Sequence, residues 1–236
     1  IWYPCKEHPS DKADSAEITI TAPDPLMAVS NGLLISKEQL SDRWTSWRWK
    51  TRYPISTYNI NITLGNFEVV EREAYILDTS LKIVYYVLPE AEKGAKELLT
   101  LSEEYLNFYA KYFGQYPWIK EKFGLVHTPY WGMEHQTISS MGGHSEWLIA
   151  HELGHQWWGD LVTCTSFHHI WLNEGFARFC EAIWDEASQG FEAYKSYWQS
   201  HSYFGPGTIY VEEPNTAAQI FNGNPVTYTH LRAHET

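Results

Sequence analysis

The feature that most constrains this chain is a pair of histidines four residues apart, His151 and His155, in the run His-Glu-Leu-Gly-His. On a helix, residues with this spacing lie about 40° apart around the axis and about 6 Å apart along it, so both side chains leave from one face. Two imidazoles placed in this way can share one metal ion. The pattern therefore predicts a metal-bearing helix in the second half of the chain.

Two glutamates complete the predicted site. A zinc ion that performs hydrolysis takes three protein ligands and keeps a fourth position for water, and two histidines with one glutamate are a known ligand set. Glu174, nineteen positions after His155, is the predicted third ligand. Glu152 lies about 100° round the helix from His151, so it cannot easily join both histidines around one ion. We expect Glu152 to act instead as a general base on the water.

The competing interpretation is a helix that carries two solvated histidines by chance. Two features of the sequence argue against it. An apolar, tryptophan-rich frame, with Trp147 to Ala150 before the motif and Trp157-Trp158 after it, suits a metal site that excludes water. The requirement for a glutamate at one set position also lowers the chance of an accidental match.

The longer runs from His151 to Thr163 and from Trp171 to Ala177 resemble the gluzincin aminopeptidases of the aminopeptidase N and leukotriene hydrolase type. The resemblance implies a thermolysin-like catalytic domain that binds one zinc ion per chain. Upstream, Gly132-Met133-Glu134 resembles the G-x-M-E-N motif of the family, whose glutamate holds the free amino group of the substrate. We therefore expect these three residues to bind substrate, with His135 in the place of the usual asparagine.

The family also carries a tyrosine, some five or six dozen residues after the zinc glutamate, that hydrogen-bonds the transition-state oxyanion. Tyr228 falls at about that distance and is the expected counterpart, the alternative being an aromatic residue without a catalytic role. The family's K-G-A context is absent here. Residues 229–236 do not resemble the family and have the character of a non-native tail.

Histidines that bind a metal usually donate their other ring nitrogen to a carboxylate or a carbonyl. Asp160 and Glu181 are the carboxylates predicted for this role, and solvated surface charge is the alternative for each. Glu181 lies two turns beyond Glu174 on nearly the same helix face. The adjacent pair His168-His169 is better explained as part of a loop, because neighbouring side chains face apart.

Composition excludes several other classes of function. The net charge of −12 argues against nucleic acid as a partner, because phosphate binding needs clustered lysine and arginine. Acidity suits a peptide substrate with a free, cationic N-terminus, although it also serves solubility. No run of 18 apolar residues exists, so we predict no membrane span. The three cysteines have no ligand spacing and are expected to be buried thiols.

The hydrophobic pattern divides the chain into two parts. From Ala16 to about Leu88 apolar residues alternate with polar ones, as in the run from Tyr58 to Leu64, which predicts an antiparallel sheet or sandwich of short strands. Pro89 marks the expected domain boundary. Beyond it we predict helices at 90–112, from Ser145 to Gly159, at 171–188 and at 191–203, and strands at 122–128 and 136–141.

The expected fold class is therefore α+β. Residues 1–88 form the C-terminal part of an N-terminal β-domain, and residues 89–228 form an incomplete thermolysin-like catalytic domain. Residues 2–13 and 28–32 resemble the later part of the family's β-domain. We accordingly expect a C-terminally truncated fragment that lacks the C-terminal helical domain of its parent protein. Such a fragment should bind zinc and turn over substrate feebly or not at all.

The favoured function is a zinc metallo-aminopeptidase that hydrolyses the N-terminal peptide bond. One alternative is a zinc endopeptidase with the same site, which would also cleave peptides whose N-terminus is acetylated. Another is a non-catalytic, zinc-binding member of the same fold. An intact general base, Glu152, argues against the last alternative, because a site that has lost its catalytic activity does not need one.

Overall fold

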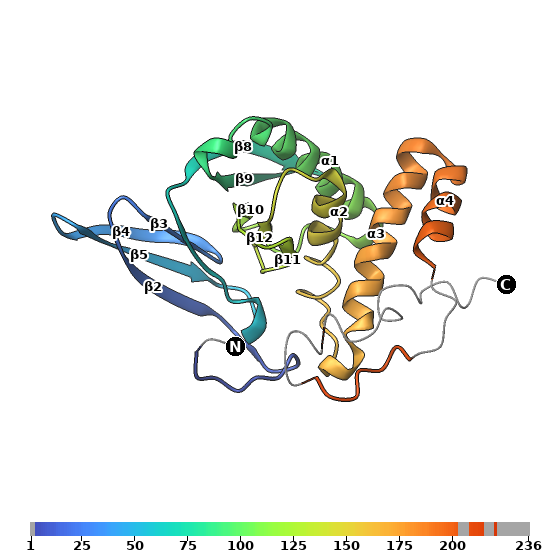
Figure 1. Ribbon diagram of the computed structural model, residues 1–236, viewed down its shortest axis with the longest axis horizontal. Helices are drawn as coiled ribbons and strands as arrows, with labels where there is room; N and C mark the ends of the chain where they lie inside the picture. Colours follow the sequence, from blue (N-terminus) through green and yellow to red (C-terminus); the bar gives the residue numbers. More distant parts are fainter. Residues whose placement is uncertain (1–2, 203–207, 215–219, 221–236) are drawn as a thin grey trace.

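The structure is a computed structural model, and it describes residues 3–202, 208–214 and 220. Figure 1 shows a group of β-strands at one end of the molecule, a second sheet with helices in the middle, and helices α3 (Trp171–Gln189) and α4 (Phe191–His201) at the other end. This arrangement confirms the α+β class and the order of a β-domain followed by a helix-rich catalytic part. Tyr228 and residues 229–236 lie outside the described residues.

The N-terminal part, residues 3–67, is called the β-domain below. It is made only of antiparallel pairs, as predicted for this region. The alternation of β5 is the clearest, because every second residue from Thr45 to Thr51 is buried. Its pairs are β1 (Lys12–Ala13) with β6 (Ile55–Ser56), β2 (Ala16–Pro23) and β4 (Leu33–Ser41) with β5 (Trp44–Thr51), and β3 (Met27–Ser30) with β7 (Ile62–Gly65).

One stretch of the β-domain differs from the prediction. The alternation from Tyr58 to Leu64 predicted a strand throughout, but residues Thr57–Asn59 form a 3₁₀ turn, η1, and only Ile62–Gly65 is a strand. The reason is a set of tertiary contacts. Tyr58 and Asn59 make hydrogen bonds to the catalytic part, and a continuous strand would direct these two side chains away from their partners.

The catalytic part is organised on a mixed sheet in the order β11-β12-β10-β9-β8. Its strands are β8 (Glu68–Ile76), β9 (Thr79–Val87), β10 (Lys122–His127), β11 (Gly132–Met133) and β12 (Ile138–Met141). Strands β9, β10 and β12 run parallel, while β8 and β11 are antiparallel to their neighbours. Because β8 and β9 belong to this sheet, sheet membership places the boundary before Glu68 rather than at Pro89 as predicted.

Four α-helices follow or interrupt the sheet, namely α1 (Ala95–Phe113), α2 (Glu146–Gly154), α3 (Trp171–Gln189) and α4 (Phe191–His201). Short 3₁₀ turns at Pro89–Ala91 and Phe167–His169 precede α1 and α3. Helix α1 connects the parallel strands β9 and β10 and packs on β8 and β9. Among the described helices, none combines the length and apolarity needed to cross a membrane.

The two faces of the mixed sheet bury different cores. On one face, Ile83 and Tyr85 of β9 pack in a cluster with α1, α2 and Trp157. On the other face, Val84 and Tyr86 pack in a cluster with strands of the β-domain. The alternation of β9 thus directs successive residues to two partners. The sheet is fixed between the helices and the β-domain, and its strands β11 and β12 lie against α2.

Candidate metal centre

Helix α2 carries the first part of the predicted site. Ser145 caps its N-terminus, with its hydroxyl oxygen accepting a hydrogen bond from the backbone N–H of Leu148 at 3.3 Å, as predicted. The helix ends at Gly154, five residues before the predicted end at Gly159. Beyond His155 the backbone N–H groups of Gln156 and Trp157 bond to carbonyls three residues back, and those of residues 160–162 bond to carbonyls five residues back. Gly159 has a φ of 143°. His155 therefore lies at the end of the helix.

Three side chains meet at one point, as the sequence predicted for a metal site. The Nε2 atoms of His151 and His155 are 3.1 Å apart, and Oε2 of Glu174 lies 3.3 Å from the first and 3.7 Å from the second. All three residues are buried. A tetrahedral zinc ion with ligand distances of about 2.0–2.1 Å requires ligand atoms about 3.3–3.4 Å apart, so the triangle has the right size.

The hydrogen bonds of the two imidazoles show that a cation fits this triangle. The Nδ1 atom of His155 faces the carbonyl oxygen of Trp158 at 3.0 Å, and Nδ1 of His151 faces Oε1 of Glu181 at 2.6 Å. Since both partners accept, both Nδ1 atoms donate. When both rings are neutral, their Nε2 lone pairs face each other and a carboxylate. Three facing acceptors require positive charge between them, which a metal ion supplies.

The pKa shifts of the groups around the triangle also indicate a preference for positive charge there. Burial would raise the pKa of Glu174, but His155 and His151 outweigh it and hold that pKa well below its usual range. Burial lowers the pKa of His151, yet hydrogen bonds to Glu174 and Glu181 outweigh this effect and raise it to about 9. The ionised Glu174 carboxylate therefore favours positive charge beside it, whether a proton on His151 or a metal ion supplies that charge.

Glu152, the predicted general base, points to the same region from the next position on α2. Its carboxylate is buried, and Oε2 has no hydrogen-bond partner among the described residues. Burial raises the pKa of Glu152 to about 8, against the opposing influence of His151 and His155. A carboxyl group with this pKa can both accept and return a proton near neutral pH.

The segment predicted to bind substrate lies against these residues. Gly132 and Met133 form the edge strand β11, which pairs with β12, and Glu134 follows directly. Atoms of Glu134, Glu152 and His155 lie within 4.8 Å of one another. Glu134 is buried, its Oε1 has no partner among the described residues, and burial raises its pKa despite the nearby His155. Glu134 can therefore accept a hydrogen bond from a ligand.

The absence of a side chain at Gly132 makes room for Glu152. A Cβ atom built on Gly132 would overlap Oε1 of Glu152 and come within 2.8 Å of a methyl group of Leu148. Glycine at this position therefore allows the edge strand to lie directly over the carboxylate.

The two predicted partners of the histidines behave differently. Glu181 accepts the hydrogen bond from His151 and also one from the hydroxyl of Tyr197 at 2.7 Å. The carboxylate of Asp160 does not accept from the ring of His155, because the carbonyl of Trp158 takes that place, and Asp160 meets His155 through a backbone N–H that donates to the His155 carbonyl at 3.0 Å. The prediction for Asp160 was therefore wrong. Its Oδ1 accepts a hydrogen bond from Nδ2 of Asn59 at 2.6 Å instead.

Several residues of the centre were not predicted from the sequence. Gln156 follows His155 directly, and its Oε1 accepts from the backbone N–H of Thr137 at 2.9 Å, which ties the histidine segment to the segment after Glu134. Asn173 precedes Glu174 and donates to the hydroxyl of Tyr58 at 3.2 Å. Gln156 and Asn173 lie directly beside motif residues, and this position could have indicated a role at the site. Tyr58 carried no such signal, because the alternation around it indicated a strand.

Comparison with known proteins identifies relatives of both parts of the chain. The model of the peptidase M1 N-terminal domain matches residues 1–59, and that of the peptidase family M1 domain matches residues 134–205. Human glutamyl aminopeptidase is 29% identical over 199 residues, which cover 77% of this chain and 20% of the relative. Aminopeptidase N of Haemonchus contortus is 30% identical over 199 residues, covering 76% of this chain and 20% of the relative.

Solved structures show the same fold. A two-domain M1 zinc metallopeptidase mutant bound to L-arginine is 25% identical, with a TM-score of 0.72, and the match covers 84% of this chain and 46% of that one. An M1 zinc metallopeptidase mutant from Deinococcus radiodurans is 22% identical, with a TM-score of 0.76 and coverage of 97% and 53%. The chain spans about a fifth of the length of the curated relatives it matches.

Proposed function

Because the chain belongs to peptidase family M1, we propose that its metal centre is that of a zinc aminopeptidase, which releases the residue at the free N-terminus of a peptide. One observation carries the exopeptidase part of this proposal. Glu134, a buried carboxylate with an unpartnered oxygen, lies beside the general base and one metal ligand. A peptide held there by its ammonium group presents its first peptide bond to the centre.

His151, His155 and Glu174 would hold one zinc ion per chain. A zinc ion in this position supplies Lewis acidity toward the scissile carbonyl and the attacking water. Glu181 and the carbonyl of Trp158 keep the two imidazoles in the tautomer that offers Nε2 to the ion. Buried surroundings strengthen these charge interactions because little solvent screens them.

Glu152 would move the proton. Its unpartnered Oε2 is free to accept a proton from the attacking water, and the protonated carboxyl can then donate it to the amine that leaves. Gly132 contributes by leaving the space in which this carboxylate lies.

Substrate binding would rest on Gly132, Met133 and Glu134. Among the described strands β11 pairs only with β12, so its other backbone edge would take an extended peptide, and the Glu134 carboxylate would pair with the ammonium group. The proposal also assigns oxyanion stabilisation to Tyr228, which lies outside the described residues.

The test compares two coumarin amides of one amino acid, with a free and with an acetylated amino group, at high protein concentration. We expect zinc-dependent cleavage of the free amide only, and loss of that cleavage in Glu152→Gln with zinc retained. Glu134→Gln should raise KM more than it lowers kcat. Equal cleavage of both amides would instead support a zinc endopeptidase.

A further inference from the structure

The loop that follows α2 carries an unusual series of hydrogen bonds. Residues Trp158 to Leu161, called the anchor loop below, present four successive backbone carbonyls, and each of them accepts a hydrogen bond from a side chain. The first, that of Trp158, accepts from Nδ1 of the metal ligand His155. The position of this carbonyl therefore fixes the orientation of one ligand.

Each of the other three carbonyls accepts a hydrogen bond from the β-domain, and the hydroxyl of Thr163 also donates to those of Gly159 at 2.5 Å and Asp160 at 3.4 Å. The hydroxyl of Tyr58 donates to Gly159 at 3.3 Å. The ammonium group of Lys12 donates to Asp160 at 2.6 Å and to Leu161 at 2.9 Å. A fourth contact joins side chains, since Nδ2 of Asn59 donates to Oδ1 of Asp160 at 2.6 Å. Three residues of one domain thus hold a single loop of the other.

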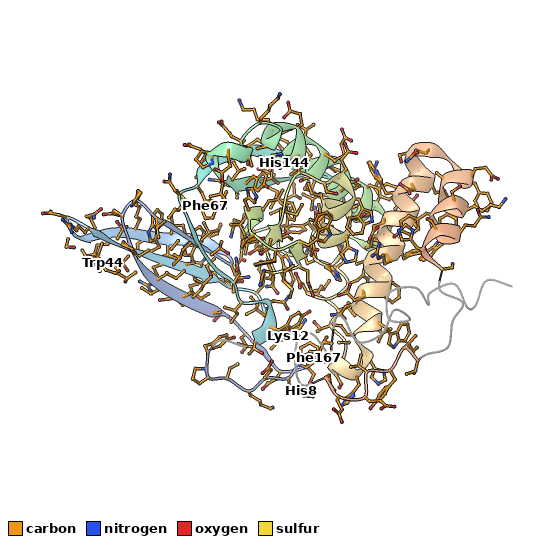
Figure 2. All side chains as sticks on the ribbon, viewed as in Figure 1. His8, Lys12, Trp44, Phe67, His144 and Phe167 are labelled. Atoms are coloured by element: carbon orange, nitrogen blue, oxygen red, sulfur yellow. The ribbon has the colours of Figure 1, made fainter. Side chains whose placement is uncertain are left out.

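These three donors lie together because of a small structural unit in the β-domain. Strands β1 and β6 pair with Lys12 opposite Ser56, and η1 follows β6 immediately, so Lys12, Tyr58 and Asn59 are neighbours. Figure 2 labels Lys12, in β1, and Phe167, in the 3₁₀ turn that precedes α3. The ring of Tyr58 packs edge-on against Phe167, with centroids 5.4 Å apart.

The same unit also reaches the other ligand segment. The hydroxyl of Tyr58 accepts a hydrogen bond from Nδ2 of Asn173, the residue before the ligand Glu174, at 3.2 Å. Oδ1 of Asn173 in turn accepts from the backbone N–H of Cys164 at 3.1 Å. Tyr58 therefore bridges the loop behind His155 and the first turn of α3, which carries Glu174.

We infer that Lys12, Tyr58 and Asn59 of the β-domain are positioning residues of the metal centre, which set the zinc affinity by holding the anchor loop and the start of α3 in the ligand arrangement. A histidine and a glutamate brought together by two separate segments bind metal well only when both segments are held in place. The inference rests on the metal centre of the proposed function but not on the reaction it catalyses.

The experiment measures the zinc dissociation constant of the full chain by competition with a chelator. Tyr58→Phe keeps the ring and removes both hydrogen bonds, and Lys12→Met keeps the stem and removes the charge. We expect each to weaken zinc binding about threefold to tenfold, somewhat less than direct partners of metal ligands do. Lys12→Arg should restore most of the affinity, because it still donates to two carbonyls.

The matched control is Thr45→Val, also in the β-domain. The hydroxyl of Thr45 is buried and donates to Asp24 at 2.7 Å, in the three-stranded sheet that contains β5. This variant should lower the melting temperature while leaving zinc affinity within twofold of the unaltered chain. A general loss of stability is thereby separated from an effect on the centre.

A second readout follows the ligand geometry directly. Cobalt(II) bound in place of zinc gives visible absorption that depends on coordination, and we expect Tyr58→Phe to change this spectrum while Thr45→Val does not. Zinc affinities of Tyr58→Phe and Lys12→Met within twofold of the unaltered chain would overturn the inference. Tight zinc binding without any peptide cleavage would contradict the proposed function and leave this inference standing.

Discussion

The Nδ1 atom of His151 donates a hydrogen bond to Oε1 of Glu181 across 2.6 Å, although the two residues belong to different helices. This bond joins the metal ligand of α2 to the helix that carries Glu174. Glu181 is buried and also accepts from the hydroxyl of Tyr197, so its position is fixed from two sides.

Replacing Glu181 should therefore weaken metal binding. For Glu181→Gln we expect zinc affinity to fall about tenfold, because a neutral amide accepts more weakly from His151 and supports its basicity less. Chelator competition measures the change. Glu186→Gln is the control, since Glu186 is exposed on the same helix and should bind zinc as the unaltered chain does. Equal affinities of the two variants would show that the bond to His151 has no such role.

Gly132→Ala should separate catalysis from folding. The added methyl group would meet the far end of the Glu152 side chain, which can move away at little cost in stability but then leaves its position as general base. We expect kcat to fall on the order of 10²-fold with zinc retained. Activity and zinc content of the same preparation test this. Gly143→Ala, where nothing lies within 4 Å of the new methyl group, should leave both unchanged.

Gly154→Ala should act on the packing of the two ligand helices. A Cβ atom at Gly154 would lie 2.9 Å from Cβ and 3.0 Å from Sγ of Cys180, so α2 and α3 must move apart. We expect a loss of about 1–3 kcal/mol in the free energy of unfolding, together with weaker zinc binding. Urea unfolding and chelator competition measure the two effects. A variant that lost neither would show that the helices tolerate a wider separation.

Lys122 should make stability depend on pH. Its ammonium group is buried beside the carbonyls of Ser30 and Gly32 and 5.0 Å from the ring centre of Trp49, and burial lowers its pKa from 10.5 to about 7. Between these values the unfolded chain binds the proton and the folded chain does not. Stability therefore rises with pH across this window.

The contribution of Lys122 from pH 7 to pH 9 should be about 2 kcal/mol. Urea unfolding of the unaltered chain and of Lys122→Met at both values isolates it, because other groups titrate in both chains. The difference in stability between the two chains should shift by this amount. An identical pH dependence in both would contradict the prediction.

Local signals in the sequence predicted most of the centre. The convergence of His151, His155 and Glu174 could be predicted, because the helical spacing of the two histidines and the bounds of α3 were both evident in the sequence pattern. Ser145 was recognised as a cap for the same reason. These features depend on residues close together in the chain, where propensity and periodicity act directly.

Features set by contacts between distant segments could not be predicted in this way. The alternation of β8 and β9 identified strands but not their sheet, because pairing with β10 is decided by packing across the whole chain. Tyr58 looked like a strand residue for the same reason. Asp160 was a candidate because metal-bound histidines usually donate to a carboxylate or a carbonyl, whereas the turn after Gly154 directs its carboxylate to Asn59.

The hydrogen bond from Lys12 to Asp160 joins residues 148 positions apart, which has a consequence for biosynthesis. The unit that holds the loop ends at Asn59, 101 positions before Asp160, and at about 5–20 residues per second a ribosome needs about 5–20 s to make that stretch. The β1–β6 pair and the η1 turn are thus complete long before the loop they hold exists. We expect the nascent chain to acquire zinc only after Glu174 has left the ribosome, onto a β-domain that is already folded.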